Sequence, residues 1–287
     1  MWIKLEGLEN PISFDGADVL VDILRQVLRG WKLNEIPSGS GTPRIRLSAG
    51  PRGYERRSPW IGGGIEDGDA VAFMDPVDAV CDLLLDLERA YIEDTGGLLA
   101  LHAAGVEFGA NEERGLVVFP STHATGKSLL TAALAQAGQR VFADDQLPII
   151  PGDETLGVAP GFLPRLRRPL PDGVGEDLAA FVRSHEGPKS ARFRYVDLKP
   201  EALAPLGTQA PIKGVVLLDR QDGAVPVIEP ATEAEVLKAC VLQSFGRKLG
   251  ALQVLDYLHA MVQGATCVKL TYGEAHEAIP LLRETFA

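Results

Sequence analysis

The chain has 287 residues, of which 46% are hydrophobic and 23% charged, and its formal net charge is −11 at pH 7. The length supports one large or two modest domains, and the composition is typical of a soluble globular protein. The negative charge disfavours general binding to nucleic acid or to anionic membranes, because phosphate neutralisation dominates both. No apolar run approaches the length of a membrane span, and the first residues lack the basic and apolar regions of a secretory signal. We therefore expect a cytoplasmic protein.

Residues 1–95 are predicted to form a small α/β N-terminal domain. An apolar stripe predicts a helix over 16–28, and residues of β character predict short strands at 44–47 and 71–73. Appended units of this kind most often pack, dimerise or position a partner, so we expect a structural role.

A second helix is predicted to begin at Asp75, because an aspartate followed by Pro76 combines an N-cap with a proline at the first helical position. Its apolar stripe ends before Gly96. We expect this helix to connect the N-terminal domain to a larger domain over 96–287.

Two paired strands are predicted at the start of the larger domain, over 98–104 and 106–108. This pairing would place His102 on a strand. A single histidine on a strand is more often structural than catalytic.

A strand, a loop, a helix and a second strand are predicted between Leu116 and Ala143. Residues 116–119 form a short apolar run, and the helix over 127–137 has an apolar stripe followed by a stop at Gly138. Residues 141–143 are predicted to form the neighbouring parallel strand.

The two acidic residues after that strand, Asp144 and Asp145, are expected near the loop. A strand–helix–strand unit crosses over right-handed, so they would reach the carboxyl edge of the sheet, on the same side as the loop.

The loop before the helix differs at one residue from the phosphate-loop pattern G-x-x-x-x-G-K-S/T, since Ser121 stands where the first glycine is usual. Backbone N–H groups and the helix dipole attract an anion at the start of a helix, while Lys127 adds a charge and Ser128 a hydroxyl for Mg²⁺. The alternative is an ordinary strand-to-helix turn that contains Gly-Lys-Ser. The expected nucleotide-binding residues are Ser121, Thr122, His123, Ala124, Thr125, Gly126, Lys127 and Ser128.

Three short motifs together resemble one family. Leu101-His102, Gly126-Lys127-Ser128 and Ala143-Asp144-Asp145, with eighteen positions from Lys127 to Asp145, resemble the catalytic domain of the HPr kinase/phosphorylase family of P-loop kinases. The resemblance is best over 96–150. It implies an α/β fold in which a P-loop HPr kinase-like catalytic domain follows the small α/β N-terminal domain.

The resemblance also implies roles for individual residues. Lys127 would hold the β- and γ-phosphates, Ser128 and Asp144 would bind the metal, and Asp145 would take the proton of the acceptor hydroxyl. His102 would support the same site. The loop departs from the family's usual G-x-S-G-x-G-K-S at Ser121, His123 and Ala124.

The function implied is that of a Mg²⁺-dependent kinase. Such an enzyme would use ATP or GTP and move the γ-phosphoryl group to a hydroxyl of a protein, peptide or small molecule. The alternative, favoured by the altered loop, is a nucleotide-binding regulatory or assembly module with little turnover. A third interpretation, a nucleotide hydrolase, lacks a separate water-positioning motif. Analogy with the family adds the expectation of a homo-oligomer.

The segment over 161–195 carries seven Lys or Arg against four Asp or Glu, which gives it a net charge of +3 and leaves −14 for the rest of the chain. Its prolines predict little regular structure in its first part. Two interpretations are open: a mobile lid whose Arg165, Arg167 and Arg168 reach the triphosphate, or a solvated loop whose arginines pair with acids elsewhere.

The C-terminal part is predicted to alternate strands and helices, with a capping box at Thr232-x-x-Glu235. The three cysteines are odd in number and lie in apolar surroundings, so we expect buried thiols rather than disulfides or a zinc site. The predicted elements are strands at 214–218, 225–228 and 266–270, helices at 232–245 and 251–262, and an end helix containing Pro280.

Overall fold

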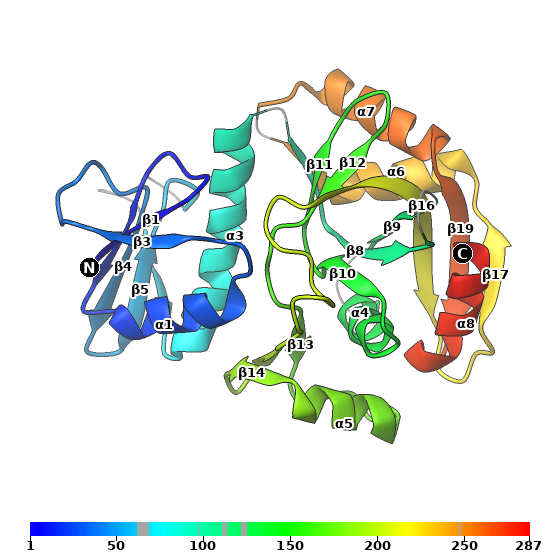
Figure 1. Ribbon diagram of the computed structural model, residues 1–287, viewed down its shortest axis with the longest axis horizontal. Helices are drawn as coiled ribbons and strands as arrows, with labels where there is room; N and C mark the ends of the chain where they lie inside the picture. The colour runs from blue at the N-terminus through cyan, green and yellow to red at the C-terminus, as the bar shows by residue number, and fades with distance from the viewer. Residues whose placement is uncertain (62–68, 97, 111–113, 122–124, 247) are drawn as a thin grey trace.

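The computed structural model describes residues 1–61, 69–96, 98–110, 114–121, 125–246 and 248–287. Over these residues the chain is a mixed α/β protein with three β-sheets. Figure 1 shows a smaller sheet near the N-terminus, a larger sheet with its helices in the second half of the chain, and the long helix α3 between them.

The N-terminal sheet has six strands among the described residues, in the order β3-β1-β2-β4-β5-β6. Its inward-facing side chains alternate along the strands, as in Ile3 and Leu5 or Ile12 and Phe14, and all four are buried. The strands at 44–47 and 71–73 and the helix at 16–28 are confirmed. The elements are β1 (Trp2–Leu5), β2 (Ile12–Asp15), α1 (Asp18–Val27), β3 (Leu33–Ile36), β4 (Ile45–Gly50), β5 (Gly53–Arg57) and β6 (Val71–Phe73).

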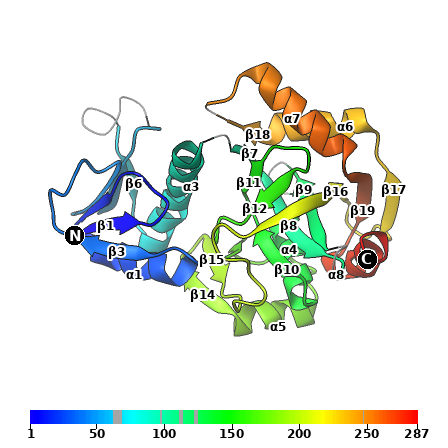
Figure 2. The ribbon, with the colours of Figure 1, turned by 45° about the horizontal axis from the view of Figure 1, so that its top comes forward.

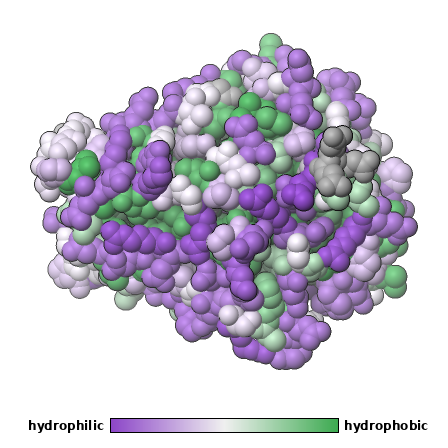
Figure 3. All heavy atoms as spheres, viewed as in Figure 1, coloured by the Kyte–Doolittle hydropathy of each residue, from purple (hydrophilic) through white to green (hydrophobic). Residues whose placement is uncertain are grey.

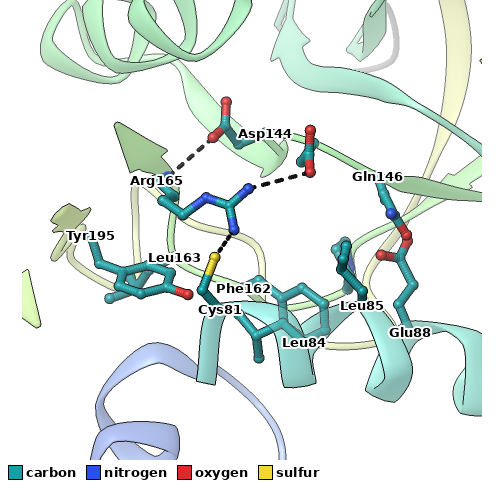
Figure 4. Close-up of a pocket in the computed structure, with 12 residues that line it drawn as sticks. Cys81, Leu84, Leu85, Glu88, Asp144, Gln146, Phe162, Leu163, Arg165 and Tyr195 are labelled. Carbon is teal, nitrogen blue, oxygen red and sulfur yellow. Dashed lines mark hydrogen bonds and ion pairs between the residues drawn. The ribbon is translucent and has the colours of Figure 1, made fainter. Parts of the chain in front are cut away.

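Helix α3 (Pro76–Thr95) begins and ends as predicted. The Asp75 carboxylate accepts a hydrogen bond from the Val77 backbone N–H at 2.8 Å, Pro76 is the first helical residue, and Gly96 ends the helix with φ 70°. The helix buries one side against α1 and β5. Cys81 and Glu88, both buried, lie on the part of α3 that faces Asp145 and Arg165 of the larger half (Figure 4).

The larger sheet has ten strands among the described residues, and β16 is its centre. β9 and β19 both pair with β16 in parallel, while β12 pairs antiparallel with its first residues. The strands are β7 (Leu99–Leu101), β8 (Ala103–Phe108), β9 (Gly115–Pro120), β10 (Arg140–Ala143), β11 (Leu147–Ile150), β12 (Leu156–Val158), β16 (Gln209–Arg220), β17 (Val227–Pro230), β18 (Ser244–Phe245) and β19 (Thr266–Tyr272).

Four helices accompany this sheet. Figure 2 shows α6 and α7 lying together on one side of it, while α4 and α8 lie on the other. The capping box that begins α6 is confirmed, because the Thr232 hydroxyl accepts from the Glu235 backbone N–H and the Glu235 carboxylate accepts from the Thr232 N–H. The helices are α4 (Lys127–Gln136), α6 (Glu233–Gln243), α7 (Ala251–Gln263) and α8 (Ala275–Thr285).

Strand 141–143 is not the neighbour of the strand before the loop, which corrects the prediction. β8 lies between β9 and β10 and is antiparallel to both. β10 therefore still runs in the same direction as β9, and their carboxyl ends share one edge of the sheet. The expected position of Asp144 and Asp145 on the loop side is retained for this reason.

The predicted pairing of 98–104 with 106–108 is wrong. β7 pairs with β11 and β18, whereas β8 pairs with β9 and β10. His102 lies at the bend between β7 and β8 and not on a strand. The whole stretch from Leu98 to Val106 is apolar and buried apart from His102, so hydrophobic periodicity gives no sign of the bend.

The basic segment 161–195 is folded, which corrects the prediction of little regular structure in its first part. β13 (Arg165–Arg167), β15 (Phe193–Val196) and β14 (Glu186–Lys189) form the third sheet, and α5 (Glu176–Ser184) precedes β14. The prolines at 164 and 169 flank β13, so its backbone N–H groups remain available for pairing.

The two halves of the chain contact each other through a hydrogen bond, a β-bridge and a shared hydrophobic core. The Trp31 indole N–H donates to the Pro160 carbonyl at 2.8 Å, and Leu28 forms a β-bridge with Phe162. Buried side chains of the N-terminal sheet, α3, α4 and the basic segment form one hydrophobic core. The boundary between 95 and 96 stays a prediction. Within the described ranges, no helix combines the length with the apolar character needed to cross a membrane.

Candidate functional site

The start of α4 has a backbone shape that requires glycine. Gly126 is the N-cap with φ 84°, in the left-handed region. A Cβ atom there would lie 2.7 Å from the Tyr272 hydroxyl oxygen, and that hydroxyl donates to the Thr125 carbonyl at 3.2 Å. β19 thus holds the end of the loop in place. Thr122, His123 and Ala124 lie outside the described residues, whereas Ser121 is buried at the end of β9.

A cavity of about 700 Å³ opens in front of this helix start. Four strands that run in the same direction, β9, β10, β16 and β19, end beside it, as ligand sites at the carboxyl edge of α/β sheets do. The lining residues include His102, Thr125, Gly126, Lys127, Ser128, Asp145, Arg165, Arg167, Arg168, Asp172, Phe193 and Arg220.

Asp145 is the carboxylate at the centre of the site. Its Oδ1 lies 2.9 Å from His102 Nε2 and 3.5 Å from Lys127 Nζ, and its Oδ2 lies 3.7 Å from an Arg165 guanidinium nitrogen. Burial opposes ionisation of this group. The His102 hydrogen bond and the Lys127 and Arg165 charges outweigh burial and hold the pKa of Asp145 well below its ordinary value.

Lys127 is buried, with 7% of its surface exposed. Burial lowers the pKa of Lys127, although Asp145 and Asp144 act in the opposite direction. A buried ammonium beside a carboxylate at the start of a helix is a group that an incoming phosphate can recruit.

Asp144 fits the expected metal ligand. The carboxyl is 8% exposed, its Oδ2 accepts from the Arg165 backbone N–H at 3.0 Å, and its Oδ1 is buried without a hydrogen-bond partner among the described residues. Burial raises the pKa of Asp144, and the hydrogen bond from the Arg165 backbone N–H partly offsets this. Mg²⁺ is usually held by one or two protein oxygens together with substrate phosphates. Asp144 and Ser128 suit that mode of binding. Among the described residues, no group of three or more His, Cys, Asp or Glu side chains is placed to hold a metal ion.

His102 is held from both sides. Its backbone N–H donates to the Gln243 carbonyl at 2.8 Å, and its Nδ1 lies 2.9 Å from Gln243 Oε1. Gln243 is the last residue of α6, so this helix orients the imidazole whose Nε2 contacts Asp145. The histidine therefore contacts the site as predicted, although from a bend.

Arg165 connects the site to the N-terminal half (Figure 4). Its guanidinium donates to the Cys81 sulfur on α3, approaches Asp145 and lies over the Phe193 ring at 4.7 Å. Burial acts to lower the pKa of Arg165, but Cys81, Tyr195, Asp145 and Asp144 outweigh it and raise that pKa.

A second, small cavity of about 50 Å³ lies on the α3 side of Arg165 and Asp145. Glu88 lies beside it, 2% exposed, and its Oε1 has no hydrogen-bond partner among the described residues. Figure 4 shows the Glu88 and Gln146 side chains pointing toward each other. Burial and the nearby Asp145 raise the pKa of Glu88 well above its ordinary value.

The sequence indicated Asp144, Asp145, His102 and Lys127, and these four lie together at one edge of the sheet. It did not indicate Arg220, Tyr272, Gln243 or Glu88, which come from distant segments. For Arg220 a signal existed: the buried strand over 214–218 was predicted, and a charged residue soon after a buried parallel strand lies at the ligand-binding edge.

Comparison with known proteins gives a weak structural likeness. No protein-family model matches the sequence, and no curated protein matches it. Among solved structures, the HPr(Ser) kinase/phosphatase from Coxiella burnetii matches with 14% identity and a TM-score of 0.32. The match covers 65% of this chain and 92% of that chain. A likeness of this size leaves the function to be argued from the geometry of the site.

Proposed function

We propose that this protein binds a purine nucleoside triphosphate with Mg²⁺ and transfers its γ-phosphoryl group to a hydroxyl of an acceptor. The observation that carries the proposal is the position of the Asp145 carboxylate. It lies 3.5 Å from Lys127 Nζ, at the start of α4, inside a cavity of about 700 Å³. Phosphoryl transfer mainly needs groups that position the reactants and offset charge, and these residues provide both.

Each residue has a role in this proposal. Lys127, the N–H groups at the start of α4 and Arg220 bind the phosphates. Ser128 and Asp144 hold Mg²⁺, which offsets negative charge on the phosphates when it is bound. Asp145 accepts the proton of the acceptor hydroxyl, and His102 orients that carboxylate.

The low pKa of Asp145 has a consequence for the order of events. A carboxylate held by His102, Lys127 and Arg165 is a weak base. When phosphates draw Lys127 away, Asp145 loses one positive neighbour and its pKa rises. The base therefore becomes stronger once the nucleotide is bound.

The same observation favours a second candidate, a nucleotide-binding regulatory module with little turnover. If Lys127 stays with Asp145 when nucleotide binds, the carboxylate remains a weak base and transfer is slow. Phosphate transfer and phosphate release, measured with Mg-ATP or Mg-GTP in the presence and absence of hydroxyl compounds, separate the two candidates.

Variants test the roles directly. Lys127→Ala is expected to lose nucleotide binding, measured by calorimetry, whereas Lys199→Ala removes an exposed lysine outside the cavity and should bind as the wild type does. Asp145→Asn is expected to keep nucleotide affinity and to lose transfer by at least about 100-fold, because an amide cannot accept the proton. No detectable binding of either triphosphate at millimolar concentration would refute the proposal.

A further inference from the structure

The large cavity has two chemically different ends. One end is the start of α4, with Lys127 and Arg220, where the phosphates are proposed to bind. The other end lies beyond Asp145 and is formed by β13 and the residues after it, including Arg167, Arg168 and Phe193. An acceptor hydroxyl must lie between the γ-phosphate and Asp145, so the remainder of the acceptor faces this second end.

Arg167 is a cation without a partner at that end. It is exposed, it lines the cavity, and no ion pair or side-chain hydrogen bond engages it among the described residues. Its neighbours differ in this respect. Arg165 is engaged by Asp145 and Cys81, and Arg168 donates to the Ser190 carbonyl.

The strand sets the spacing between this cation and the base. Arg165 and Arg167 are two residues apart on β13, so their side chains leave the same face of the strand, on the order of 7 Å apart. Arg165 reaches Asp145 Oδ2 at 3.7 Å. A group bound by Arg167 therefore lies a few bonds away from a hydroxyl that faces Asp145, a span that a small molecule can cover.

We propose, on the basis of the proposed function, that the acceptor is a small molecule carrying an anionic group, a phosphate or a carboxylate, which Arg167 binds with support from Arg168. A guanidinium binds either group with two parallel hydrogen bonds. Asp172 is the acidic residue that lines this end, and the arginines outnumber it. Their positive charge disfavours a cationic acceptor, and a neutral acceptor would offer no charged group for Arg167 to bind.

Binding to the nucleotide complex tests the proposal without requiring turnover. The protein saturated with Mg²⁺ and a non-hydrolysable ATP analogue is titrated by calorimetry with glycerol 3-phosphate, with glycerate and with glycerol. At least one of the two anionic probes is expected to bind at least about tenfold more tightly than glycerol, and the two distinguish a phosphate from a carboxylate preference.

Substitution of the arginine provides the matched test. Arg167→Gln should weaken the preferred anionic probe by about tenfold or more and leave the affinity for the ATP analogue unchanged. Arg183→Gln removes the same charge from α5 in the same segment, outside the large cavity, and should leave both affinities unchanged.

The outcomes separate this inference from the proposed function. Suppose that nucleotide binds. Equal affinity for all three probes, or an Arg167→Gln variant that binds the preferred probe as the wild type does, would then overturn the anionic acceptor and leave the proposed kinase activity standing. The same conclusion would follow if an acidic peptide, titrated in the same way, bound more tightly than either small anion. Absence of nucleotide binding would overturn both.

Discussion

Gly126 shows how one residue can determine the shape of the site. An alanine there must adopt a left-handed backbone at a cost of about 1–2 kcal/mol, and its Cβ would also collide with the Tyr272 hydroxyl. Gly138, at the other end of α4, has φ 91° with open space around it. Gly138→Ala therefore measures the free-energy cost of a left-handed alanine alone, without the collision that Gly126→Ala also causes.

We predict that Gly126→Ala lowers thermal stability more than Gly138→Ala does. We also predict that only Gly126→Ala loses nucleotide binding, because the shift needed to relieve the collision moves the start of α4. Calorimetric unfolding and nucleotide titration of both variants check this. Equal losses of stability with nucleotide binding retained in both would show that Tyr272 does not fix the loop.

Glu88 is a buried acid whose charge state should appear in the pH dependence of stability. Its folded pKa is raised, so above the unfolded value of about 4.3 the folded state retains a proton that the unfolded chain releases. The free energy of unfolding therefore falls as pH rises from about 4.3 toward the folded pKa. Arg89 acts to lower this pKa, while burial and Asp145 raise it more strongly.

Glu88→Gln is expected to remove this dependence and to stabilise the protein at neutral pH by on the order of 1 kcal/mol, since its amide N–H can donate to Gln146 Oε1. The two proteins should have similar stability below about pH 4. Glu277→Gln, at an exposed position on α8, is the control. Parallel stability profiles from pH 4 to 8 for wild type and Glu88→Gln would contradict the raised pKa.

The two ends of α6 are expected to affect different properties of the protein, stability at the first turn and phosphoryl transfer at the last residue. Its first turn carries the capping box, and its last residue, Gln243, orients His102. Thr232→Ala should cost about 1 kcal/mol of stability and leave phosphoryl transfer unchanged at permissive temperature. Gln243→Ala should lower the rate of transfer and leave nucleotide affinity unchanged, because only the orientation of His102 is lost.

Nuclear magnetic resonance of the His102 ring provides a readout independent of turnover. Its nitrogen shifts should change in Gln243→Ala and stay the same in Thr232→Ala, because only the first variant removes the partner of Nδ1. Unchanged His102 shifts in Gln243→Ala would show that α6 does not orient the ring.

The elements that the sequence predicted well are those with local signals. Asp75-Pro76 marks the start of α3, and Thr232 with Glu235 marks the start of α6, because caps satisfy backbone groups within a few residues. Strand order was predicted less well. Nothing local in β10 shows that β8 would lie between it and β9, because pairing partners are chosen by packing across the sheet.

For the residues of the site, too, local sequence signals were predictive and long-range contacts were not predicted. Lys127 and Asp145 were predicted because both lie within one strand–helix–strand unit. Gln243 and Glu88 were not, because long-range contacts bring them to the site and their own sequence surroundings contain no motif, and for Arg220 the only signal was its place after a predicted buried strand. The basic segment lies between these cases: its charge was visible in the sequence, but its fold as β13, β15, β14 and α5 depends on contacts with the rest of the molecule.

At the scale of the whole molecule, the N-terminal half forms one wall of the small cavity beside the site. α3 contributes Cys81 to Arg165 and Glu88 to the surroundings of Asp145. Figure 3 shows hydrophilic side chains over much of the face seen in Figure 1, with apolar patches among them. The two halves are expected to act as one unit in stability.

The last prediction tests this expectation and the predicted boundary at 95/96. Because buried side chains of α3, including Leu83 and Leu87, share one core with α4 and the basic segment, the halves should unfold together. Calorimetry of the full chain should give a single transition in which the calorimetric and van't Hoff enthalpies agree.

A chain of residues 96–287 is expected to be strongly destabilised or insoluble, since loss of α3 exposes part of that core and leaves Arg165 without Cys81. A chain of residues 76–287 keeps α3 and is the matched control, expected to retain more structure by circular dichroism. Two separate transitions in the full chain, or a stable 96–287 fragment that binds Mg-ATP with wild-type affinity, would show that the two halves are independent domains and that α3 is dispensable for the site.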